Sequence, residues 1–416
     1  MKVVLLNTYD KKGGAAIACD RLNQAHIQNG IESNKFVLHK APETYSGVTV
    51  HKSIFPDKIN KNYEHLIEKL VFRPHEASKE IRFAFSLGLH GKNLKKFEII
   101  QDADIIHLHW INNGFLSLRS IDYLLSLNKP IVWTMHDMWP FTGGCHYAGD
   151  CNHYEGTCGQ CHFLKKPEAE DISNKIWNKK KELFQNASNL TFVGCSRWLS
   201  DLAKTGSLLQ DQSVVNIPNC IDTNTYKPHF KSIGTKYVLL FQAMNINEER
   251  KGLTYLIDCL RILREKYPEV KNKIKLLIFG EIRSDEFLLD LDYEVELLGS
   301  LTNQEDIIKA YQKANIFITP SLQDNLPNTV MESLACGIPV LGFETGGIPE
   351  MVDHKINGYI APHKDSEGLA EGLKWIIGER ERYLELCQNA RKKVLENYTY
   401  NQISAKYLKL YQSLLN

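Results

Sequence analysis

The sequence predicts an α/β protein built from two doubly wound domains. Short runs rich in Val, Ile, Leu and Phe alternate along the chain with longer amphipathic stretches. This alternation is typical of parallel strands that crossover helices cover on both faces. The chain has 416 residues, which is too long for one ordinary hydrophobic core. We therefore expect two Rossmann-like domains, each with its own core.

The candidate strands fall into two series. Strands of the first series are expected at 2–7, 35–38, 104–110, 130–136, 190–195 and 213–218. Strands of the second series are expected at 237–243, 274–280, 294–299, 315–320 and 339–343. The turn-rich stretch 222–234 between them is interpreted as a linker. The predicted N-terminal domain covers residues 1–225, and the predicted C-terminal domain covers residues 234–396.

Three further segments are not accounted for by these strands. Residues 41–58 and 72–96 are expected to form long irregular insertions in the N-terminal domain. The last segment, 401–415, is amphipathic and carries Ile403, Tyr407 and Leu410 on its apolar side. Its pattern alone allows it to pack on either domain.

Composition excludes several classes of protein. Fifty Lys and Arg residues against 49 Asp and Glu residues give a net charge of +1, so no overall field attracts nucleic acid, and no nucleic-acid partner is expected. The apolar start of the chain is too short for a signal peptide, and no apolar run reaches membrane-spanning length. We therefore expect a cytoplasmic protein. Its ten cysteines should be reduced thiols unless a cluster of them holds a metal.

The first candidate site is the loop 9–16, which follows the first strand and contains Gly13 and Gly14. Small residues let a ligand approach the N-terminus of the following helix, where free N–H groups attract anions. The alternative is a plain tight turn, since the G-x-G-x-x-G pattern of dinucleotide sites is absent.

The second candidate site is His136, which stands beside Asp137 at the end of the strand 130–136. Ligands of open α/β sheets bind beyond the carboxyl ends of the strands, so a histidine there is expected to face a ligand. His107 and His109 share one face of a neighbouring strand. His107 is interpreted as structural, and the role of His109 stays open.

The third and fourth candidate sites belong to the second series. Arg250 and Lys251 follow its first strand, where they are either solvated charges or anion ligands. Pro327 followed by Asn328 is typical of a helix start, which would direct backbone N–H groups at a diphosphate. Asp324 and Glu332 flank that start, so they could accept hydrogen bonds from the hydroxyls of a sugar nucleotide. The predicted nucleotide-binding residues of this segment are Asn325, Leu326, Asn328, Thr329, Val330 and Glu332.

This segment resembles the retaining glycosyltransferases of family 4. In that family a Glu-x7-Glu element precedes Ala-x-x-x-Gly-x-Pro-Val and a Gly-Gly-x-x-Glu loop. Here the element runs from Asp324 to Glu332, followed by a Gly337-Ile-Pro-Val sequence and a Gly346-Gly-Ile-Pro-Glu loop. Asp324 replaces the first Glu, which puts the identity of the donor sugar in doubt.

The resemblance implies the GT-B fold, in which two Rossmann-like domains face each other across a cleft. It also implies that the last helix, here 399–416, crosses back to the N-terminal domain.

Site roles follow from the resemblance as well. Asp324 would bind hydroxyls of the donor sugar, and Glu332 would bind the ribose. Lys251 would bind the diphosphate, and Arg250 would replace an arginine that the family has a few residues upstream. By the same resemblance, Gly13 and Gly14 would line the phosphate and acceptor side, and His136 would contact the transferred sugar.

The implied reaction moves a hexose-type sugar, with retention, from a UDP- or GDP-sugar to a glycan or lipid-linked acceptor in polysaccharide assembly. No cofactor is expected for catalysis, because cationic side chains and a helix N-terminus would meet the charge of the leaving diphosphate. The pairs 102/104 and 290/292 have the Asp-x-Asp spacing of a cation site but are interpreted as surface charge. The alternatives are a sugar-nucleotide epimerase or hydrolase of the same fold and a non-catalytic nucleotide-sugar or glycan-binding protein.

Four cysteines cluster after His136, namely Cys145, Cys151, Cys158 and Cys161. Four thiols within 17 residues, including a Cys-x2-Cys pair, favour a structural zinc site in a reducing compartment. Two disulfides are the competing interpretation, since the longer gaps are irregular for a zinc ribbon.

The segment 73–97 interleaves basic and aromatic residues. We expect an amphipathic helix that covers the N-terminal sheet. The alternative is a membrane-surface patch, which would associate the protein peripherally with the inner face of a membrane that carries a lipid-linked acceptor.

Overall fold

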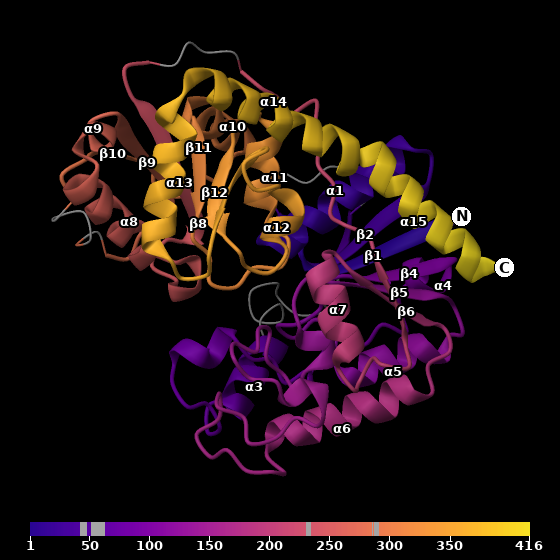
Figure 1. Cartoon of the computed structure of the whole chain (residues 1–416). Helices are drawn as coiled ribbons and strands as arrows, with labels where there is room; N and C mark the ends of the chain where they lie inside the picture. The colour runs from indigo at the N-terminus through magenta and orange to yellow at the C-terminus, as the bar shows by residue number, and fades with distance from the viewer. Residues whose placement is uncertain (42–47, 51–62, 230–233, 285, 287–290) are drawn as a thin grey trace. The chain divides into compact units, whose positions relative to one another are not determined.

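The computed structural model describes residues 1–41, 48–50, 63–229, 234–284, 286 and 291–416 (Figure 1). It divides into two compact units. The first unit comprises Met1–Cys220 together with Tyr400–Asn416, and the second comprises Ile221–Thr399. Each unit is a parallel α/β sheet with helices on its faces, so both are Rossmann-like.

In the described part of the first unit, the sheet has seven strands in the order β3-β2-β1-β4-β5-β6-β7. Each neighbouring pair is parallel. The strands are β1 (Lys2–Tyr9), β2 (Glu32–His39), β3 (Val48–Val50), β4 (Ile105–Leu108), β5 (Ile131–Met135), β6 (Leu190–Gly194) and β7 (Ser213–Asn216). The helices are α1 (Gly14–Gln28), α3 (Tyr63–Phe72), α4 (Glu98–Gln101), α5 (Leu118–Ser126), α6 (Ile172–Gln185), α7 (Arg197–Thr205) and α15 (Tyr400–Leu415), with 3-10 turns η1 (Glu80–Phe83), η2 (Trp139–Phe141) and η3 (His153–Glu155).

The described residues of the second unit form a parallel sheet of six strands in the order β10-β9-β8-β11-β12-β13. The strands are β8 (Tyr237–Asn245), β9 (Ile274–Glu281), β10 (Glu294–Leu297), β11 (Ile316–Thr319), β12 (Val340–Phe343) and β13 (Gly358–Ala361). The helices are η4 (Glu249–Lys251), α8 (Leu253–Lys266), α9 (Pro268–Lys271), α10 (Gln304–Lys313), α11 (Asn328–Ala335), α12 (Ile348–Met351), α13 (Ser366–Gly378) and α14 (Arg380–Asn397).

Alternation along β1 gives the first unit two cores. Val4 and Leu6 point into one, which they share with large aromatic side chains such as Trp133. Val3 and Leu5 point to the opposite face, where they meet apolar residues of α1 and α15. A period of two residues thus places one core on each face of the sheet.

The C-terminal helix α15 packs on the first unit, as predicted. Its Tyr407 and Tyr411 are buried there. The two nitrogens of the buried His26 ring in α1 bond to Ser404 Oγ (3.0 Å) and to Tyr411 Oη (3.1 Å). Tyr407 Oη also bonds to Thr134 Oγ1 of β5 at 2.8 Å. A last segment of the chain therefore completes the core of the first unit.

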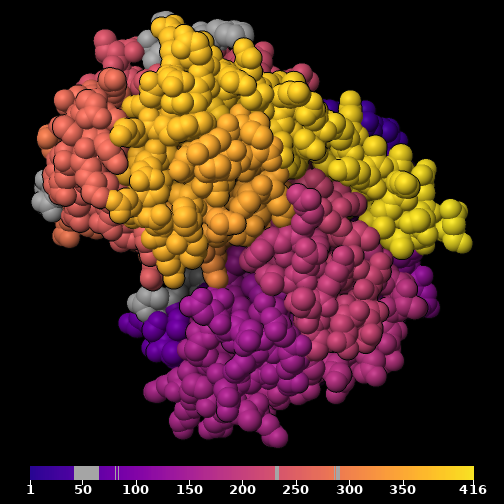
Figure 2. Space-filling model, in the orientation of Figure 1, coloured from indigo at the N-terminus to yellow at the C-terminus, as the bar shows by residue number. Residues whose placement is uncertain are grey.

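Helix α14 is amphipathic in the second unit. Its buried residues are Tyr383, Leu386, Ala390 and Val394, and the opposite face lies at the surface (Figure 2). On the same helix, the Arg391 guanidinium donates to three backbone carbonyls, those of Tyr226 (2.7 Å), Ala335 (2.7 Å) and Thr223 (2.8 Å). Because Ala335 ends α11, Arg391 ties that helix to α14.

All eleven predicted strands are present, but β3 and β13 were not predicted. Strand β13 is only Gly-Tyr-Ile-Ala after an Asn-Gly pair, which is typical of a turn. Strand β3 falls in the insertion 41–58, of which only residues 41 and 48–50 lie within the described part of the chain. In the expected linker, residues 230–233 lie outside the described residues.

The predicted amphipathic helix at 73–97 is wrong. Apart from the 3-10 turn η1, the described residues of this segment are irregular. Gly88 has a φ of +63°, and a Cβ on Gly91 would lie 2.3 Å from the Ser117 nitrogen, so the chain turns sharply and packs tightly there. Phe85 and Leu87 lie in the core and Lys92 is buried, so these three do not form a surface patch.

None of the helices in the described ranges combines the length and the apolar composition that crossing a bilayer requires.

Candidate functional site

The loops at the carboxyl ends of β8, β11 and β12 pack against one another through glycines. Gly252, after β8, has a φ of +72°, and a Cβ there would lie 1.8 Å from the Pro320 oxygen. Gly346, after β12, has a φ of +55°, and a Cβ there would lie 1.7 Å from the Asp324 oxygen. Any side chain at either position would collide with backbone. The Gly-Gly loop and the Lys-Gly pair therefore fix the position of the loop that carries Asp324.

Arg250 and Lys251 converge on Asp324. Lys251 Nζ lies 2.7 Å from Asp324 Oδ2, and Arg250 Nη1 lies 3.6 Å from the same oxygen. Arg250 Nη1 also donates to the Gln323 carbonyl at 2.7 Å. Burial alone would raise the pKa of Asp324, but Lys251 and Arg250 outweigh it, so this pKa is lowered. Two cations and the ionised Asp324 carboxylate therefore meet at the strand exits, where Arg250 Nε also pairs with Glu248 Oε1 at 2.9 Å.

The next helix, α11, begins at Asn328, with Pro327 as its N-cap residue, as the sequence predicts. Asn325, Leu326, Asn328 and Val330 are buried around this start. A helix start directs backbone N–H groups outward and is suited to an anion, although here the Val330 N–H already bonds to the Pro327 oxygen at 3.1 Å.

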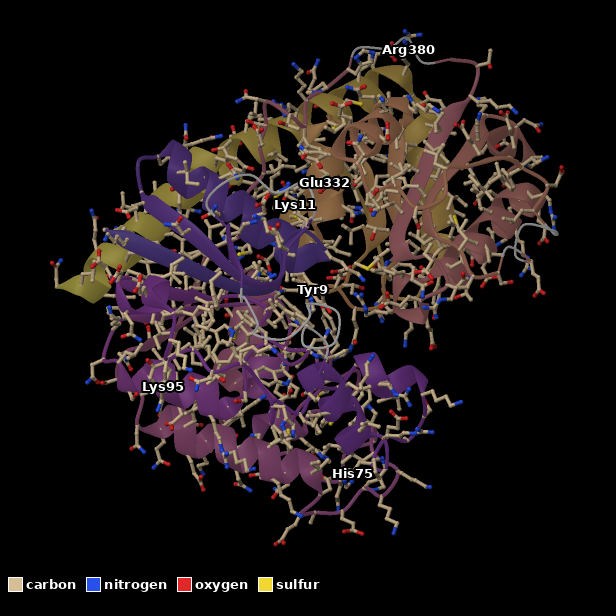
Figure 3. The ribbon with its side chains drawn as sticks, turned by 180° about the vertical axis from the view of Figure 1, so that it is seen from behind. Tyr9, Lys11, His75, Lys95, Glu332 and Arg380 are labelled. Carbon is tan, nitrogen blue, oxygen red and sulfur yellow. The ribbon has the colours of Figure 1, made fainter. Side chains whose placement is uncertain are left out.

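Glu332 lies one turn into α11 (Figure 3) and is buried. Tyr311 Oη of α10 donates to Glu332 Oε2 at 2.9 Å and lies 3.2 Å from the Thr329 oxygen. Burial, then the nearby Glu332 carboxylate, raises the pKa of Tyr311 well above its usual range, so its hydroxyl stays a donor. Tyr311 thus orients the carboxylate. Tyr311 was not predicted as a site residue, because it stands on an ordinary amphipathic helix.

In the first unit, Tyr9 ends β1 (Figure 3). Gly13 has a φ of +91° and precedes α1, which begins at Gly14. Asp10 in this loop is buried and pairs with Lys35, which also pairs with Asp20. This buried cluster was not predicted, although a lysine beside the apolar run of β2 was a signal for it.

His136 follows β5 and stacks on His109, with ring centroids 5.2 Å apart. His136 Nε2 lies 2.9 Å from His109 Nδ1, so one ring donates to the other. Burial lowers the pKa of His136 to about 4 and that of His109 well below its usual value. Both rings are therefore neutral near pH 7. His107 beneath them bonds to Thr134 and Tyr411, which confirms its structural role.

Among the described residues, His109 Nε2 is buried without a hydrogen-bond partner. A buried lone pair without a partner costs less than a buried N–H without one, so the His109 proton belongs on Nδ1 and is donated to His136. His136 then carries its own proton on Nδ1. This tautomer makes His136 a neutral hydrogen-bond donor.

Asp137 holds the next segment in place. Its Oδ2 accepts from Trp110 Nε1 at 2.9 Å and lies 2.7 Å from His146 Nδ1, and its Oδ1 accepts from the Trp139 N–H at 2.9 Å. Burial would raise the pKa of Asp137, but His146 and these donors lower it. Asp137 is thus an anchor rather than a free acid.

The two Asp-x-Asp pairs lie elsewhere. Asp104 precedes β4, at the amino end of the sheet, where its carboxylate accepts from the Lys2 N–H at 2.7 Å. Exposed Asp292 pairs with Lys271 at 2.7 Å, and Asp290 lies outside the described residues.

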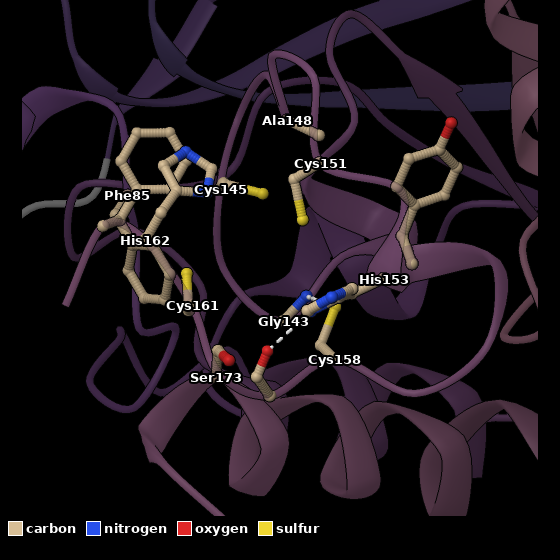
Figure 4. Close-up of a pocket in the computed structure, with 13 residues that line it drawn as sticks. Phe85, Gly143, Cys145, Ala148, Cys151, His153, Cys158, Cys161, His162 and Ser173 are labelled. Carbon is tan, nitrogen blue, oxygen red and sulfur yellow. Dashed lines mark hydrogen bonds between the residues drawn. The ribbon is translucent and has the colours of Figure 1, made fainter. Parts of the chain in front are cut away.

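The four clustered cysteines line one pocket of about 320 Å³, part of it open to solvent (Figure 4). All four are free thiols in this structure. As they are arranged, no group of three or more His, Cys, Asp or Glu side chains in the described part of the chain has the geometry of a formed metal site.

Comparison with known proteins identifies the second unit. Residues 225–393 match the family model described as glycosyl transferases group 1. Most of the second unit is therefore similar to the group 1 glycosyl transferases. The cluster of Arg250, Lys251, Asp324 and Glu332 lies inside the matched segment.

Relatives extend the likeness beyond the group 1 domain. The chain is 22% identical over 414 residues to an uncharacterized glycosyltransferase of Methanocaldococcus jannaschii, covering 96% of this chain and 94% of that protein. It is also 22% identical over 435 residues to the putative colanic acid biosynthesis glycosyl transferase WcaC of Escherichia coli, covering 100% of both. A crystal structure of Anabaena HepE in complex with UDP and glucose has a TM-score of 0.63 at 15% identity, covering 99% of this chain and 100% of that one. The fold is therefore that of the two-domain GT-B glycosyltransferases.

Proposed function

We propose that the protein transfers a hexose-type sugar, with retention, from a nucleotide diphosphate sugar to a glycan or lipid-linked acceptor in polysaccharide assembly. The observation that carries the proposal is the convergence of Arg250 and Lys251 on Asp324 beside the start of α11. Cations and backbone N–H groups suit a diphosphate, and a carboxylate suits sugar hydroxyls. The group 1 match and the relative named for colanic acid biosynthesis support the reaction class.

The proposed chemistry follows from where charge develops. The bond between the anomeric carbon and the diphosphate breaks, and a bond from that carbon to an acceptor oxygen forms on the same face. The acceptor proton goes to the leaving phosphate oxygen. Arg250, Lys251 and the N–H groups of α11 would stabilise the negative charge on the leaving group. This arrangement requires no magnesium or manganese ion, so turnover should survive EDTA at concentrations that strip those two metals.

Other residues would act on the two ends of the donor. Glu332, oriented by Tyr311, would accept hydrogen bonds from the ribose. Asp324 would accept from hydroxyls of the sugar, and neutral His136 would donate to it. Gly13 and Gly14 would leave room for phosphate and acceptor at the start of α1.

Nucleotide binding tests the proposal directly. UDP, GDP and ADP should be titrated by calorimetry into the wild type, Lys251→Ala and Glu332→Gln. Lys236→Ala is the matched control, because Lys236 is 41% exposed and pairs with Glu294 at the other end of β8. We expect one nucleotide to bind, both site variants to weaken it by at least tenfold, and the control to leave it unchanged. Wild-type affinity in both site variants would contradict the proposal.

Turnover then separates the reaction classes. UDP-glucose is the first donor to test, because HepE was crystallised with it. Sugar transfer that requires an acceptor supports a transferase. Donor breakdown at the same rate without any acceptor would identify a hydrolase or epimerase, and binding without turnover against a broad acceptor panel would identify a binding protein.

A further inference from the structure

The four clustered cysteines come from three turns of one long segment and meet in a single pocket. The backbone of Cys145 pairs with that of Phe85 in an isolated antiparallel β-bridge. Cys158 and Cys161 lie on a turn in which Gln160 has a φ of +48°. Figure 4 shows the sulfurs of Cys145, Cys151, Cys158 and Cys161 pointing into the pocket from different sides.

The segment that carries them has little regular structure to hold it. Between η2 and α6, the only described helix or strand is the three-residue turn η3. A connection of this length without secondary structure is uncommon in a compact domain and needs another source of order. Its two ends are fixed, since Lys180 donates to the carbonyls of Trp139 and Thr142, and Asp171 accepts from the Cys161 N–H at 2.8 Å. In the middle, where the cysteines lie, Ala148 and Tyr154 reach the apolar core, but no helix or strand longer than η3 orders the backbone.

Backbone donors point at two of the sulfurs. The Gly143 N–H donates to Cys158 Sγ at 3.2 Å, and the Phe163 N–H also acts on the Cys161 sulfur. Donors of this kind stabilise a thiolate, and outer hydrogen bonds of this kind typically support metal ligands. A sulfur in a disulfide carries no charge and gains little from them. The donors therefore favour a metal over two disulfides.

Charge balance also favours a cation. Cys145, Cys158 and Cys161 are buried in this pocket. Without a counter-charge, several thiolates cannot share it. A divalent ion provides that charge.

We propose that Cys145, Cys151, Cys158 and Cys161 bind one structural zinc ion as four thiolates. Zinc replaces the four thiol protons, which are released, and the four sulfurs fill its tetrahedral shell. With no open position the ion binds no substrate. Its role is to order the segment that contains His146, which bonds to Asp137 at 2.7 Å beside His136.

The test begins with the wild-type full-length protein purified without added metal. Elemental analysis should give one zinc per chain and no comparable iron, and native mass spectrometry should show the same stoichiometry. After removal of zinc under reducing conditions, cobalt(II) alone should restore one metal per chain and produce thiolate-to-cobalt charge-transfer absorption. Both measurements use the wild type, so they hold even if cysteine variants fail to fold.

Two variants locate the site. Cys158→Ser should lose at least tenfold in zinc affinity, whereas Cys387→Ser, a half-buried cysteine of α14, should keep one zinc per chain. Far-ultraviolet circular dichroism of both variants checks that the first unit, which contains Cys158, is folded. A metal-free wild type with four reactive thiols, or a wild type whose mass rises by four hydrogens on reduction, would overturn the zinc site. The first result would mean free thiols and the second two disulfides.

Discussion

Asp324 is the residue at which this chain departs from the Glu-x7-Glu pattern. Its carboxylate has two competing partners, Lys251 and the hydroxyls of the sugar. In the structure it pairs with Lys251 at 2.7 Å, and in the proposed complex it would bind sugar hydroxyls while Lys251 turns to phosphate. A carboxylate one methylene shorter reaches less far from the backbone. Before the donor binds, the Asp324 carboxylate therefore neutralises the charge of Lys251. A bound diphosphate would compete with Asp324 for this lysine.

Asp324→Asn separates these two roles. The amide no longer holds Lys251 by charge, so UDP or GDP affinity should stay the same or increase. Turnover should fall by about a hundredfold, the typical effect of losing one well-placed polar contact. Calorimetry and steady-state kinetics on the same preparation check both parts. A parallel loss of nucleotide affinity would show that Asp324 instead positions Lys251 for the phosphate.

His136→Ala tests the sugar side. Because the proposed role of this neutral ring is to donate to the transferred sugar, kcat should fall by about a hundredfold while nucleotide affinity stays near that of the wild type. His136→Gln, which keeps an N–H donor, should recover part of the lost rate. Equal loss in both variants together with a lower melting temperature would assign the ring a structural role.

At the scale of elements, α1, β4 and β5 bury a set of neutral imidazoles. Burial lowers the pKa of His26 to about 3 and that of His107 well below its usual value. The unfolded chain takes up these protons near pH 6.5, whereas the folded chain does not. The unfolded state therefore binds more protons below that pH, and the free energy of unfolding falls as pH decreases from about 6.5 to about 4.

Each such histidine should contribute roughly 1.4 kcal/mol per pH unit in this window. The buried Glu68 has the opposite effect on stability, because burial raises its pKa. The slope of the unfolding free energy against pH therefore combines several groups. The variant His26→Gln isolates the contribution of His26 to the pH dependence of the unfolding free energy. Denaturant unfolding at pH 5 and pH 7 should show a difference smaller by about 2 kcal/mol in this variant than in the wild type. An unchanged difference would contradict the neutral buried state of His26.

The side chain of Arg391 in α14 holds the end of α11 in place through hydrogen bonds to backbone carbonyls. Arg391→Ala leaves the carbonyls of Thr223, Tyr226 and Ala335 without this donor. We expect a loss of about 2 to 4 kcal/mol in unfolding free energy, since bonds to a charged donor are stronger than average and their acceptors are partly buried. Lys392→Ala is the control, because the Lys392 side chain is 69% exposed. A change within 0.5 kcal/mol for Arg391→Ala would mean that packing alone holds α11.

Elements were predictable where a local pattern determines them. Runs of buried Val, Ile, Leu and Phe gave every strand of the two sheet centres, and Pro327 marked the start of α11. The segment 73–97 was mispredicted because its apolar residues contact distant parts of the chain, as Gly91 does with Ser117. Tyr311 was missed for the same reason, since only its tertiary contacts distinguish it from an ordinary helix residue.

At the scale of the whole molecule, the first unit is discontinuous in sequence. Its two parts, Met1–Cys220 and Tyr400–Asn416, enclose the second unit along the chain. Removing 400–416 would uncover the apolar face of the first sheet and leave His26 without Ser404 and Tyr411. We expect the truncated protein to lose the cooperative unfolding of its first unit in calorimetry while the second unit still binds nucleotide. Two intact transitions would contradict this dependence.

The placement of α15 also sets an order of events during synthesis. A ribosome makes the chain from its N-terminus, so residues 1–220 emerge before the helix that seals them. Throughout translation of the second unit, the sheet face that will receive Ile403, Tyr407 and Tyr411 lacks its cover. The second unit is contiguous and can finish folding first. We therefore expect the second unit to complete its fold before the first unit does. Until α15 has left the exit tunnel, the uncovered face of the first sheet is accessible to proteases and chaperones.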